Sequence, residues 1–273
     1  MDVEALTLDA LRRQSEALNL SHREIRLLPP VLSKLTRLKR LFLNHNRLIL
    51  PPNELLHLEQ LEELVLDENQ LTVLPSEMGC LGHLGSLSVS HNPLSVLPAQ
   101  LGELAELGEL WANSCNLISL PSSVCKLHKL RKLGARNNHI TALPTEFMQL
   151  ASLQWLNLAC NGLWELPEGF GTLQTLTFLN LDGNKFEDVP ESLSDMPSLL
   201  VLHMKSNCIR SLPDDRILGF TQLTKLDLRR NPLTQRPAHW KGLDFILLGS
   251  VKEAEATDIC NTDRQTAQGC VRE

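Results

Sequence analysis

Tyrosine is absent from the 273-residue sequence, and aromatic residues make up only 4% of it. A buried core is therefore expected to be aliphatic, and the position of each aromatic residue becomes informative. No apolar run approaches the roughly 18 residues that a membrane-spanning helix needs, since the longest candidate, 243–248, is far too short. The start of the chain also lacks the basic and then apolar segments of a secretion signal. From these absences we expect a protein without a membrane span that is not secreted.

Lysine and arginine are missing from residues 48–125, which contain ten acidic residues, and the whole chain has a net charge of −6. A nucleic-acid-binding protein needs a basic stripe to neutralise phosphates. The small basic group at Lys205, Lys225, Arg229 and Arg230 is not such a stripe, so we expect no nucleic-acid partner. The uneven charge favours a protein partner of matching polarity, with an ordinary solvated surface as the alternative.

The cysteines are scattered rather than clustered, at positions 80, 115, 125, 160, 208, 260 and 270. Their number is odd, and their spacing is not that of a secreted disulfide framework. We therefore expect reduced thiols and a cytoplasmic protein, with the nucleus as the alternative compartment.

One pattern recurs through most of the chain. Residues 61–75 read LEELVLDENQLTVLP, which has the spacing L-x-x-L-x-L-x-x-N-x-L-x-x-L-P. The asparagine returns with a period of 23 residues, at positions 46, 69, 92, 138, 161, 184 and 207, with Cys115 in one copy and Asn231 delayed by an extra residue within 214–222. This is the pattern of the leucine-rich repeat. Such a unit buries its apolar edge only against its neighbours, so the sequence predicts a stack of ten repeats.

Each repeat divides into a short strand, x-L-x-L-x, and a return segment that begins with proline. We therefore predict an α/β leucine-rich-repeat solenoid with a curved, parallel, concave sheet of about ten strands and an irregular or helical convex side. The asparagine amide is expected to satisfy backbone groups in the turn that no strand satisfies. Because a thiol does this only weakly, the repeat that contains Cys115 is predicted to be softer than the others.

The chain is predicted to contain four segments. Residues 1–16 form a capping helix with Asp2 as its N-cap, a frayed terminus being the alternative. Residues 17–237 form the ten repeats, and the apolar residues within 238–248 form a C-terminal cap. Residues 249–273 lack periodicity and are predicted to be a disordered tail.

The side chains between the strand leucines are predicted to leave the core and to line the concave face. Exposed tryptophans among polar residues are typical anchors of protein interfaces, although a ring can also shield neighbouring strands. We predict a partner-binding surface with aromatic anchors and charged residues that orient the partner, formed by Phe42, Glu63, Asp67, Glu109, Trp111, Arg136, Trp155, Phe178, Lys205 and Arg229.

No catalytic, cofactor or metal-binding pattern has supporting context. Cys125 and His128 lack a second pair of ligands, and the glycines at 79, 82 and 85 do not have dinucleotide or phosphate-loop spacing. Titratable residues occupy the eighth position of four consecutive repeats, namely His22, His45, Glu68 and His91. Such a row could bind a metal ion or respond to pH, but loop positions favour small polar residues in any case. We therefore predict no enzyme activity, no cofactor and no metal.

The 23-residue repeat with Leu-Pro in fixed phase, as in LEELVLDENQLTVLPSEMGCL, resembles the intracellular leucine-rich repeats of the Ras suppressor protein and of the Scribble and Erbin family. The resemblance covers residues 17 to about 237. It implies a scaffold that binds signalling proteins through the concave face. The chain lacks the PDZ domains that Scribble and Erbin carry, so the resemblance is confined to the repeats.

These observations together predict a monomeric, non-enzymatic scaffold or adaptor in signal transduction that binds a protein partner. The alternative is a regulatory or specificity subunit of an enzyme complex, such as a ligase or a phosphatase.

Overall fold

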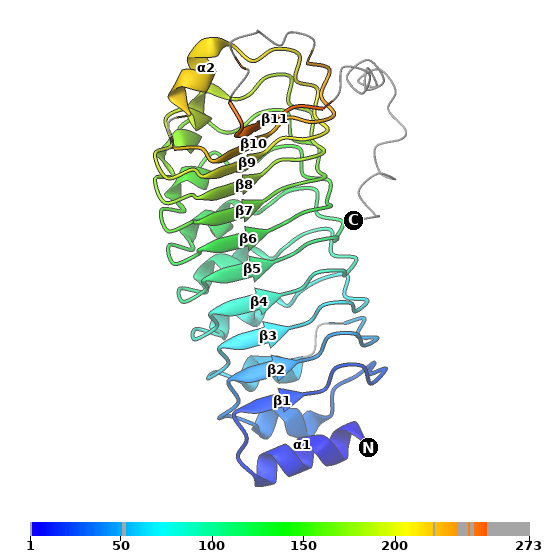
Figure 1. Cartoon of the computed structure of the whole chain (residues 1–273). Coiled ribbons are helices and arrows are strands. Elements are labelled where there is room, and N and C mark those ends of the chain that lie inside the picture. Colours follow the sequence, from blue (N-terminus) through cyan, green and yellow to red (C-terminus); the bar gives the residue numbers. More distant parts are fainter. Residues whose placement is uncertain (1, 51–52, 221, 234–239, 241–242, 250–273) are drawn as a thin grey trace. The chain divides into compact units, whose positions relative to one another are not determined.

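The computed structural model describes residues 2–50, 53–220, 222–233, 240 and 243–249 (Figure 1). The chain divides after Asn138 into two compact units, residues 1–138 and 139–273. The predicted tail at 249–273 lies outside the described residues apart from its first residue, as do the end of the last repeat and the start of the predicted C-terminal cap.

The described residues form eleven short parallel strands whose order in the sheet is their order in the sequence. The first unit contains β1 (Ala17–Asn19), β2 (Arg40–Phe42), β3 (Glu63–Val65), β4 (Ser86–Ser88), β5 (Glu109–Trp111) and β6 (Lys132–Gly134). The second unit contains β7 (Trp155–Asn157), β8 (Phe178–Asn180), β9 (Val201–His203), β10 (Lys225–Asp227) and β11 (Ile246–Leu247). This open parallel sheet with little helix confirms the predicted fold class.

The register of the sheet follows directly from the 23-residue period. Leu41 of β2 pairs with Leu64 of β3, and Leu64 pairs in turn with Leu87 of β4. All three leucines are fully buried. Because residues at the same repeat position lie side by side, the leucines form continuous apolar rows on one side of the sheet, and their neighbours form polar and aromatic rows on the other.

The core of the second unit is not purely aliphatic, so that expectation is wrong there. Phe147, Phe170 and Phe186 are almost completely buried, and the rings of Phe147 and Phe170 are stacked with centroids 6.0 Å apart. Phe147 and Phe170 occupy the repeat position that Leu101 and Val124 fill in the first unit. The same buried site of a repeat therefore accepts either an aliphatic side chain or a ring.

The asparagine of each repeat has the predicted role in the turn. In Asn69 the amide Nδ2 donates to the carbonyls of Leu43 and Leu66, both at 2.9 Å, while Oδ1 accepts from the Leu48 N–H at 3.1 Å. These bonds satisfy three buried backbone groups and join two successive repeats. Losing such a partner leaves a buried group unsatisfied, which costs about 1 to 3 kcal/mol.

Cys115 replaces this asparagine and makes a weaker set of contacts. Its Sγ lies 3.5 Å from the Val89 carbonyl. The thiol accepts no backbone N–H bond of the kind that Asn69 accepts from Leu48. The Leu94 N–H, which would have donated to an asparagine at 115, bonds instead to the Asn92 carbonyl at 2.8 Å. Burial raises the pKa of the Cys115 thiol to about 11, so it stays protonated as a weak donor.

The return segments are mostly short 3-10 helices: η1 (Pro30–Lys34), η2 (Asn53–His57), η3 (Ser76–Cys80), η4 (Ala99–Glu103), η5 (Ser122–Lys126), η6 (Phe147–Gln149), η7 (Phe170–Thr172) and η8 (Glu191–Leu193). Extended prolines precede several of them, for example Pro75 with φ −65°. Proline fixes φ near this value and so directs the chain into the turn. The extra residue in 214–222 falls on α2 (Asp214–Gly219), an α-helix in place of a 3-10 turn.

Both ends of the repeat array carry additional elements. The helix α1 (Val3–Arg12) lies beside β1 in Figure 1, and Asp2 caps it by accepting from the Glu4 N–H at 3.4 Å. At the other end, β11 pairs with β10, so the apolar cluster predicted only to cover the last repeat contributes a strand of its own. The pairing places Leu247 opposite Asp227 and thereby satisfies backbone groups of β10 that would otherwise be unpaired.

Cys160 and Cys208 each take part in a disulfide, whereas Cys80, Cys115 and Cys125 do not. The expectation of reduced thiols is therefore wrong for the first two. Sequence spacing did not show this, because disulfide formation depends on which sulfur atoms the fold brings together.

Candidate protein-binding surfaces

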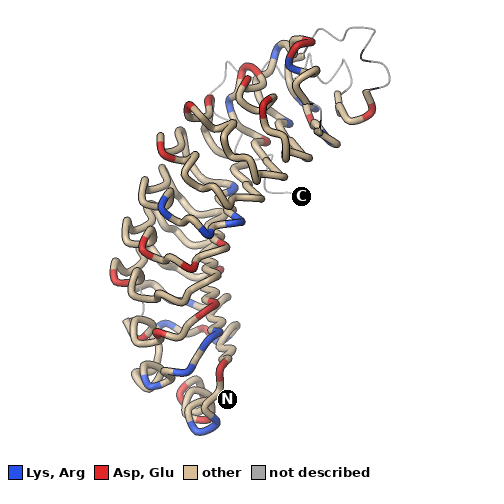
Figure 2. Tube along the Cα trace, turned by 90° about the vertical axis from the view of Figure 1, so that its left-hand side faces the viewer, with Lys and Arg blue, Asp and Glu red and all other residues tan. Residues whose placement is uncertain are grey.

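The open face is the side of the sheet opposite the leucine rows. It carries the first and third residues of each strand, together with the second residue after the strand. Figure 2 marks the charges along the chain, with residues 48–125 contributing acidic positions but no basic ones.

In the first unit, Trp111 ends β5 and is half-buried. A Cβ atom added to Gly134 on the neighbouring strand would come within 2.6 Å of the Trp111 ring. The indole therefore lies against Gly134, and a larger residue there would displace it. This contact supports the shielding role for one edge of the ring.

Glu109 holds this indole in place. Its carboxylate accepts from the Trp111 Nε1–H at 3.3 Å and forms an ion pair with Lys132 Nζ at 2.9 Å. Glu109 and Lys132 are directly opposite in the register of β5 and β6. The sequence analysis selected Glu109 and Trp111 but missed Lys132. Lys132 stands one period after Glu109, and this spacing could have predicted that the two residues lie opposite each other.

Asp67 stabilises the backbone in addition to facing the open side. Its Oδ1 accepts from Ser88 Oγ at 2.6 Å and from the Ser90 N–H at 2.7 Å. Burial raises the pKa of Asp67, and these two hydrogen bonds oppose that rise. Asn113 acts similarly two repeats later, since its Oδ1 accepts from the Arg136 N–H at 3.0 Å. One carboxylate oxygen of Asp67 is thus already engaged before any partner binds.

The other predicted residues of the first unit are spread over its strands. Phe42 is half-buried at the end of β2, opposite Val65. Glu63 lies between Arg40 and Ser86. Arg136 follows β6 and is half-buried. The structure therefore brings Glu109, Trp111 and Arg136 together around β5 and β6, and places Phe42 and Glu63 on earlier strands.

In the second unit the aromatic residues form a continuous ladder across three strands. The Trp155 and Phe178 rings are stacked, with centroids 5.2 Å apart and an interplanar angle of 7°. The His203 ring meets Phe178 at 5.6 Å with a tilt of 58°. Stacked ring pairs at these distances are favourable beyond the apolar area they bury. The ladder therefore presents one pre-arranged apolar strip on the open face.

An acidic residue lies beside the ladder. Asp182 Oδ1 accepts from the Lys205 N–H at 2.6 Å. Burial raises the pKa of Asp182 to about 6. Its Oδ2 is 3.8 Å from His203 Nδ1, too long for a hydrogen bond, and burial also lowers the pKa of His203. We therefore treat this contact as one between a neutral imidazole and a carboxylate, not as an ion pair.

Arg229 forms a two-point contact with Asp227. Its Nε donates to Oδ1 at 2.9 Å and its terminal nitrogen to Oδ2 at 2.6 Å. Burial disfavours the Asp227 carboxylate, but the hydrogen bonds from Arg229 outweigh burial and lower its pKa. Lys205 is half-buried nearby. Of the basic residues at this end, Arg229 is thus paired with Asp227.

Sequence reasoning missed His203, Asp182 and Asp227 as members of the site, although all three stood in the rows that it placed on the open face. The sequence pattern does not show how deeply each of these side chains is buried, because burial depends on the side chains of the neighbouring repeats.

The row at the eighth repeat position has a backbone explanation. His22, His45, Glu68 and His91 all have φ between 52° and 58°, a left-handed conformation in which polar residues such as asparagine and histidine are enriched. The His22 and His45 rings stack at 4.1 Å, and His45 Nδ1 lies 2.6 Å from the Glu68 carboxylate. Among the described residues, no group of three or more His, Cys, Asp or Glu side chains is arranged to hold a metal ion.

Comparison with known proteins agrees with this architecture. A family model described as a leucine-rich repeat region matches residues 114–231. A leucine-rich repeat protein of Leptospira interrogans is 30% identical with a TM-score of 0.69, over 88% of this chain and 74% of that one. The ectodomain of the Arabidopsis thaliana receptor kinase GASSHO1/SCHENGEN3 is 31% identical with a TM-score of 0.74, over 85% of this chain but only 29% of the receptor chain.

A Listeria monocytogenes internalin, 20% identical with a TM-score of 0.64 over 85% of this chain and 68% of its own, shares the fold. No curated protein matches the chain. Within the described residues, neither helix has the length and hydrophobicity needed to cross a bilayer.

The stacked strands and the asparagine bonds between repeats define a solenoid of stacked repeats. The chain belongs to the leucine-rich repeat proteins. Members of this family generally bind proteins and generally lack enzyme activity of their own.

Proposed function

We propose that this chain is a non-enzymatic scaffold or adaptor that binds a protein partner on the open face of its sheet and acts in signalling. The observation that carries the proposal is the ladder of Trp155, Phe178 and His203. Tryptophan and phenylalanine are scarce in this chain, yet Trp155 and Phe178 are stacked, and His203 meets Phe178 at a tilt, where the leucine core does not need them. Half-buried aromatic groups with polar neighbours are the usual anchors of protein interfaces.

The ten predicted residues have two roles in this proposal. Trp111, Trp155, Phe178 and Phe42 anchor the partner through apolar contact. The charged residues orient it, and they are Glu63, Asp67, Glu109, Arg136, Lys205 and Arg229. The plant receptor ectodomain similar to this chain was solved in complex with Casparian strip integrity factor 2, which supports a ligand made of protein. The proposed partner is a protein and not a nucleic acid, and the chain acts as a monomer.

The double substitution Trp111→Ala with Trp155→Ala is expected to weaken partner binding at least tenfold, because each change removes an aromatic anchor. Partners are first captured with the wild-type chain as bait, and the dissociation constant of the strongest is then measured for each variant. Ile118→Ala is the matched control, since Ile118 is 60% exposed but lies off the open face. Unchanged affinity of the double variant for every captured partner would refute the proposal.

The same capture experiment separates the adaptor from the alternative of a regulatory subunit. If a captured partner is a ligase or a phosphatase, its turnover is measured with and without this chain. A change in turnover assigns a regulatory role, and unchanged turnover leaves the adaptor role.

We propose a cytoplasmic or nuclear location, as the sequence suggests. The disulfides at Cys160 and Cys208 oppose this, because disulfides are rare in reducing compartments. Differential alkylation of the protein in the cells that make it decides the question. Reduced thiols at both positions are the result expected for a cytoplasmic protein, and disulfides there would place it in an oxidising compartment.

A further inference from the structure

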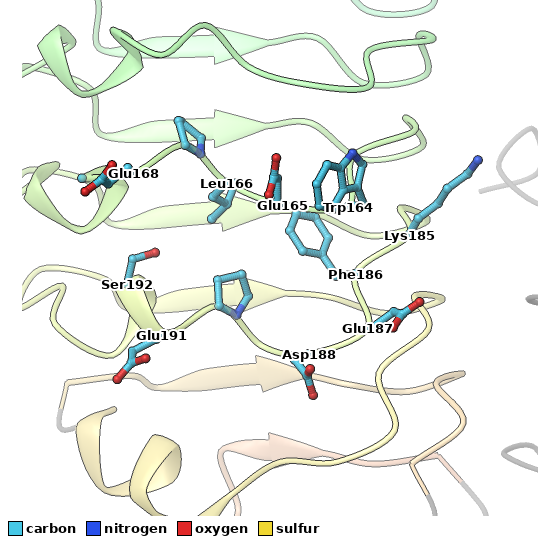
Figure 3. Close-up of a pocket in the computed structure, with 13 residues that line it drawn as sticks. Trp164, Glu165, Leu166, Glu168, Lys185, Phe186, Glu187, Asp188, Glu191 and Ser192 are labelled. Carbon is cyan, nitrogen blue, oxygen red and sulfur yellow. The ribbon is translucent and has the colours of Figure 1, made fainter.

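A pocket of about 530 Å³ lies in the second unit, between the segments that follow β7 and β8 (Figure 3). All the residues that line it come from two consecutive return segments, 164–169 and 185–192. It is separate from the aromatic ladder, whose residues do not line it. The pocket therefore requires its own explanation.

An exposed tryptophan forms one end of this pocket. Trp164 is 59% exposed, and it is the only aromatic residue among the exposed large apolar side chains in the described part of the chain. Phe186, which is almost completely buried, lies at the same end of the pocket (Figure 3). The core ring supports the position of Trp164, while much of the indole surface remains available to a ligand.

The rest of the pocket is strongly acidic. Five carboxylates line it against a single ammonium group, that of Lys185. Glu165 and Asp188 occupy equivalent positions one repeat apart, as do Glu168 and Glu191. Like charges at equivalent positions of neighbouring repeats repel one another. A cation that enters the pocket removes this repulsion.

Some of these carboxylates already have partners and others do not. Glu191 pairs with Arg216 at 3.1 Å, and Asp188 accepts from Ser211 Oγ at 3.4 Å. In the portion of the chain that the structure describes, the carboxylates of Glu165 and Glu187 form no hydrogen bond or ion pair. Glu187 stands one period after Trp164, so stacking of the repeats places its backbone beside that of Trp164.

We propose that this pocket binds an arginine side chain from a basic segment of a protein partner. The guanidinium group stacks on the Trp164 indole, and its N–H groups donate to Glu165 and Glu187. Arginine fits better than lysine, because its planar group both stacks on an aromatic ring and donates to carboxylates in a fork. An acidic ligand would be repelled, and a metal ion would gain nothing from an indole.

The probe is a fluorescein-labelled Gly-Arg-Gly-Arg-Gly-Arg-Gly peptide, titrated with the full chain at 0.15 M salt and followed by fluorescence anisotropy. Lysine and citrulline versions of the peptide are measured in parallel. The arginine peptide is expected to bind at least fivefold more tightly than the lysine peptide, and the neutral citrulline peptide not at all. Equal affinity of the arginine peptide and either of the other two peptides would overturn the assignment.

Variants locate the binding. Trp164→Ala and the pair Glu165→Gln with Glu187→Gln are each expected to weaken binding at least fivefold, while Trp164→Phe retains part of it. The pair Glu59→Gln with Glu103→Gln is the matched control, since it removes the same charge from exposed positions of the first unit. Circular dichroism melts confirm that each variant is folded. An equal loss in the control pair, or no loss in Trp164→Ala, would contradict the pocket.

Discussion

Replacing Asn92 with alanine is expected to lower the free energy of unfolding by about 3 to 5 kcal/mol, since several buried backbone groups lose their partners at once. Asn92 is only 2% exposed. Its Nδ2 donates to the carbonyls of Leu66 and Val89, both at 3.0 Å, and its Oδ1 accepts from the Leu71 N–H at 3.0 Å. No water can replace these bonds unless the turn opens.

Urea denaturation followed by circular dichroism measures this effect. Asn116→Ala is the control, because Asn116 has the same side chain but is exposed in the next repeat, and it is expected to change stability by less than about 0.5 kcal/mol. The opposite substitution, Cys115→Asn, is expected to raise the free energy of unfolding by about 1 kcal/mol. The new amide oxygen would accept from the Leu94 N–H, as the asparagines of the other repeats do for their equivalent N–H groups. Equal stability of Asn92→Ala and Asn116→Ala would show that the asparagine bonds do not hold the repeats together.

Asp182→Asn is expected to stabilise the chain by about 3 kcal/mol at pH 8 and to have almost no effect near pH 4. Burial raises the pKa of Asp182 from 3.8 to about 6, and each unit of pKa corresponds to about 1.4 kcal/mol. The full difference is therefore about 3 kcal/mol, and this net shift already includes the attraction of the charged form to Lys205 and Arg229. The asparagine amide still accepts from the Lys205 N–H through its oxygen.

The sign of the pH dependence follows from the direction of this shift. A carboxyl group with a raised pKa in the folded state binds its proton more tightly there than in the unfolded state. Its contribution to stability is complete below about pH 3.8 and is lost as the pH rises through about 6. The wild-type chain should therefore lose stability relative to Asp182→Asn across this interval.

Urea midpoints measured from pH 4 to pH 8 test this expectation. Asp195→Asn serves as the control, because Asp195 is an exposed carboxylate in the same unit, and its curve should run parallel to that of the wild type. The explanation fails if the curve of Asp182→Asn is also parallel to that of the wild type.

Much of the candidate surface could be predicted from the sequence, because the 23-residue period determines which residues lie side by side on the open face. The placement of Trp155 and Phe178 at the first position of adjacent strands required only counting in steps of 23. Their stacking at 5.2 Å did not follow from counting, because it depends on the rotamers that both rings adopt together. The same is true of the Trp111 indole, whose position depends on the missing side chain of Gly134.

Other features came from departures from the repeat, which a consensus pattern does not describe. The strand β11 has no repeat asparagine, yet it pairs with β10 because an edge strand offers unpaired backbone groups. Trp164 lies outside the strand rows, so the row pattern did not predict its exposure. The disulfides at Cys160 and Cys208 depend on distances across the folded chain.

The sequence by itself determined the fold, the strand register and the assignment of each repeat position to the core or to the open face. It could do so because stacked repeats pair equivalent positions, so a regular period fixes every neighbour along the sheet. Only the tertiary structure decided which outward side chains are buried, charged or available. Those properties depend on the particular side chains of neighbouring repeats, as the raised pKa of Asp182 and the open indole of Trp164 show.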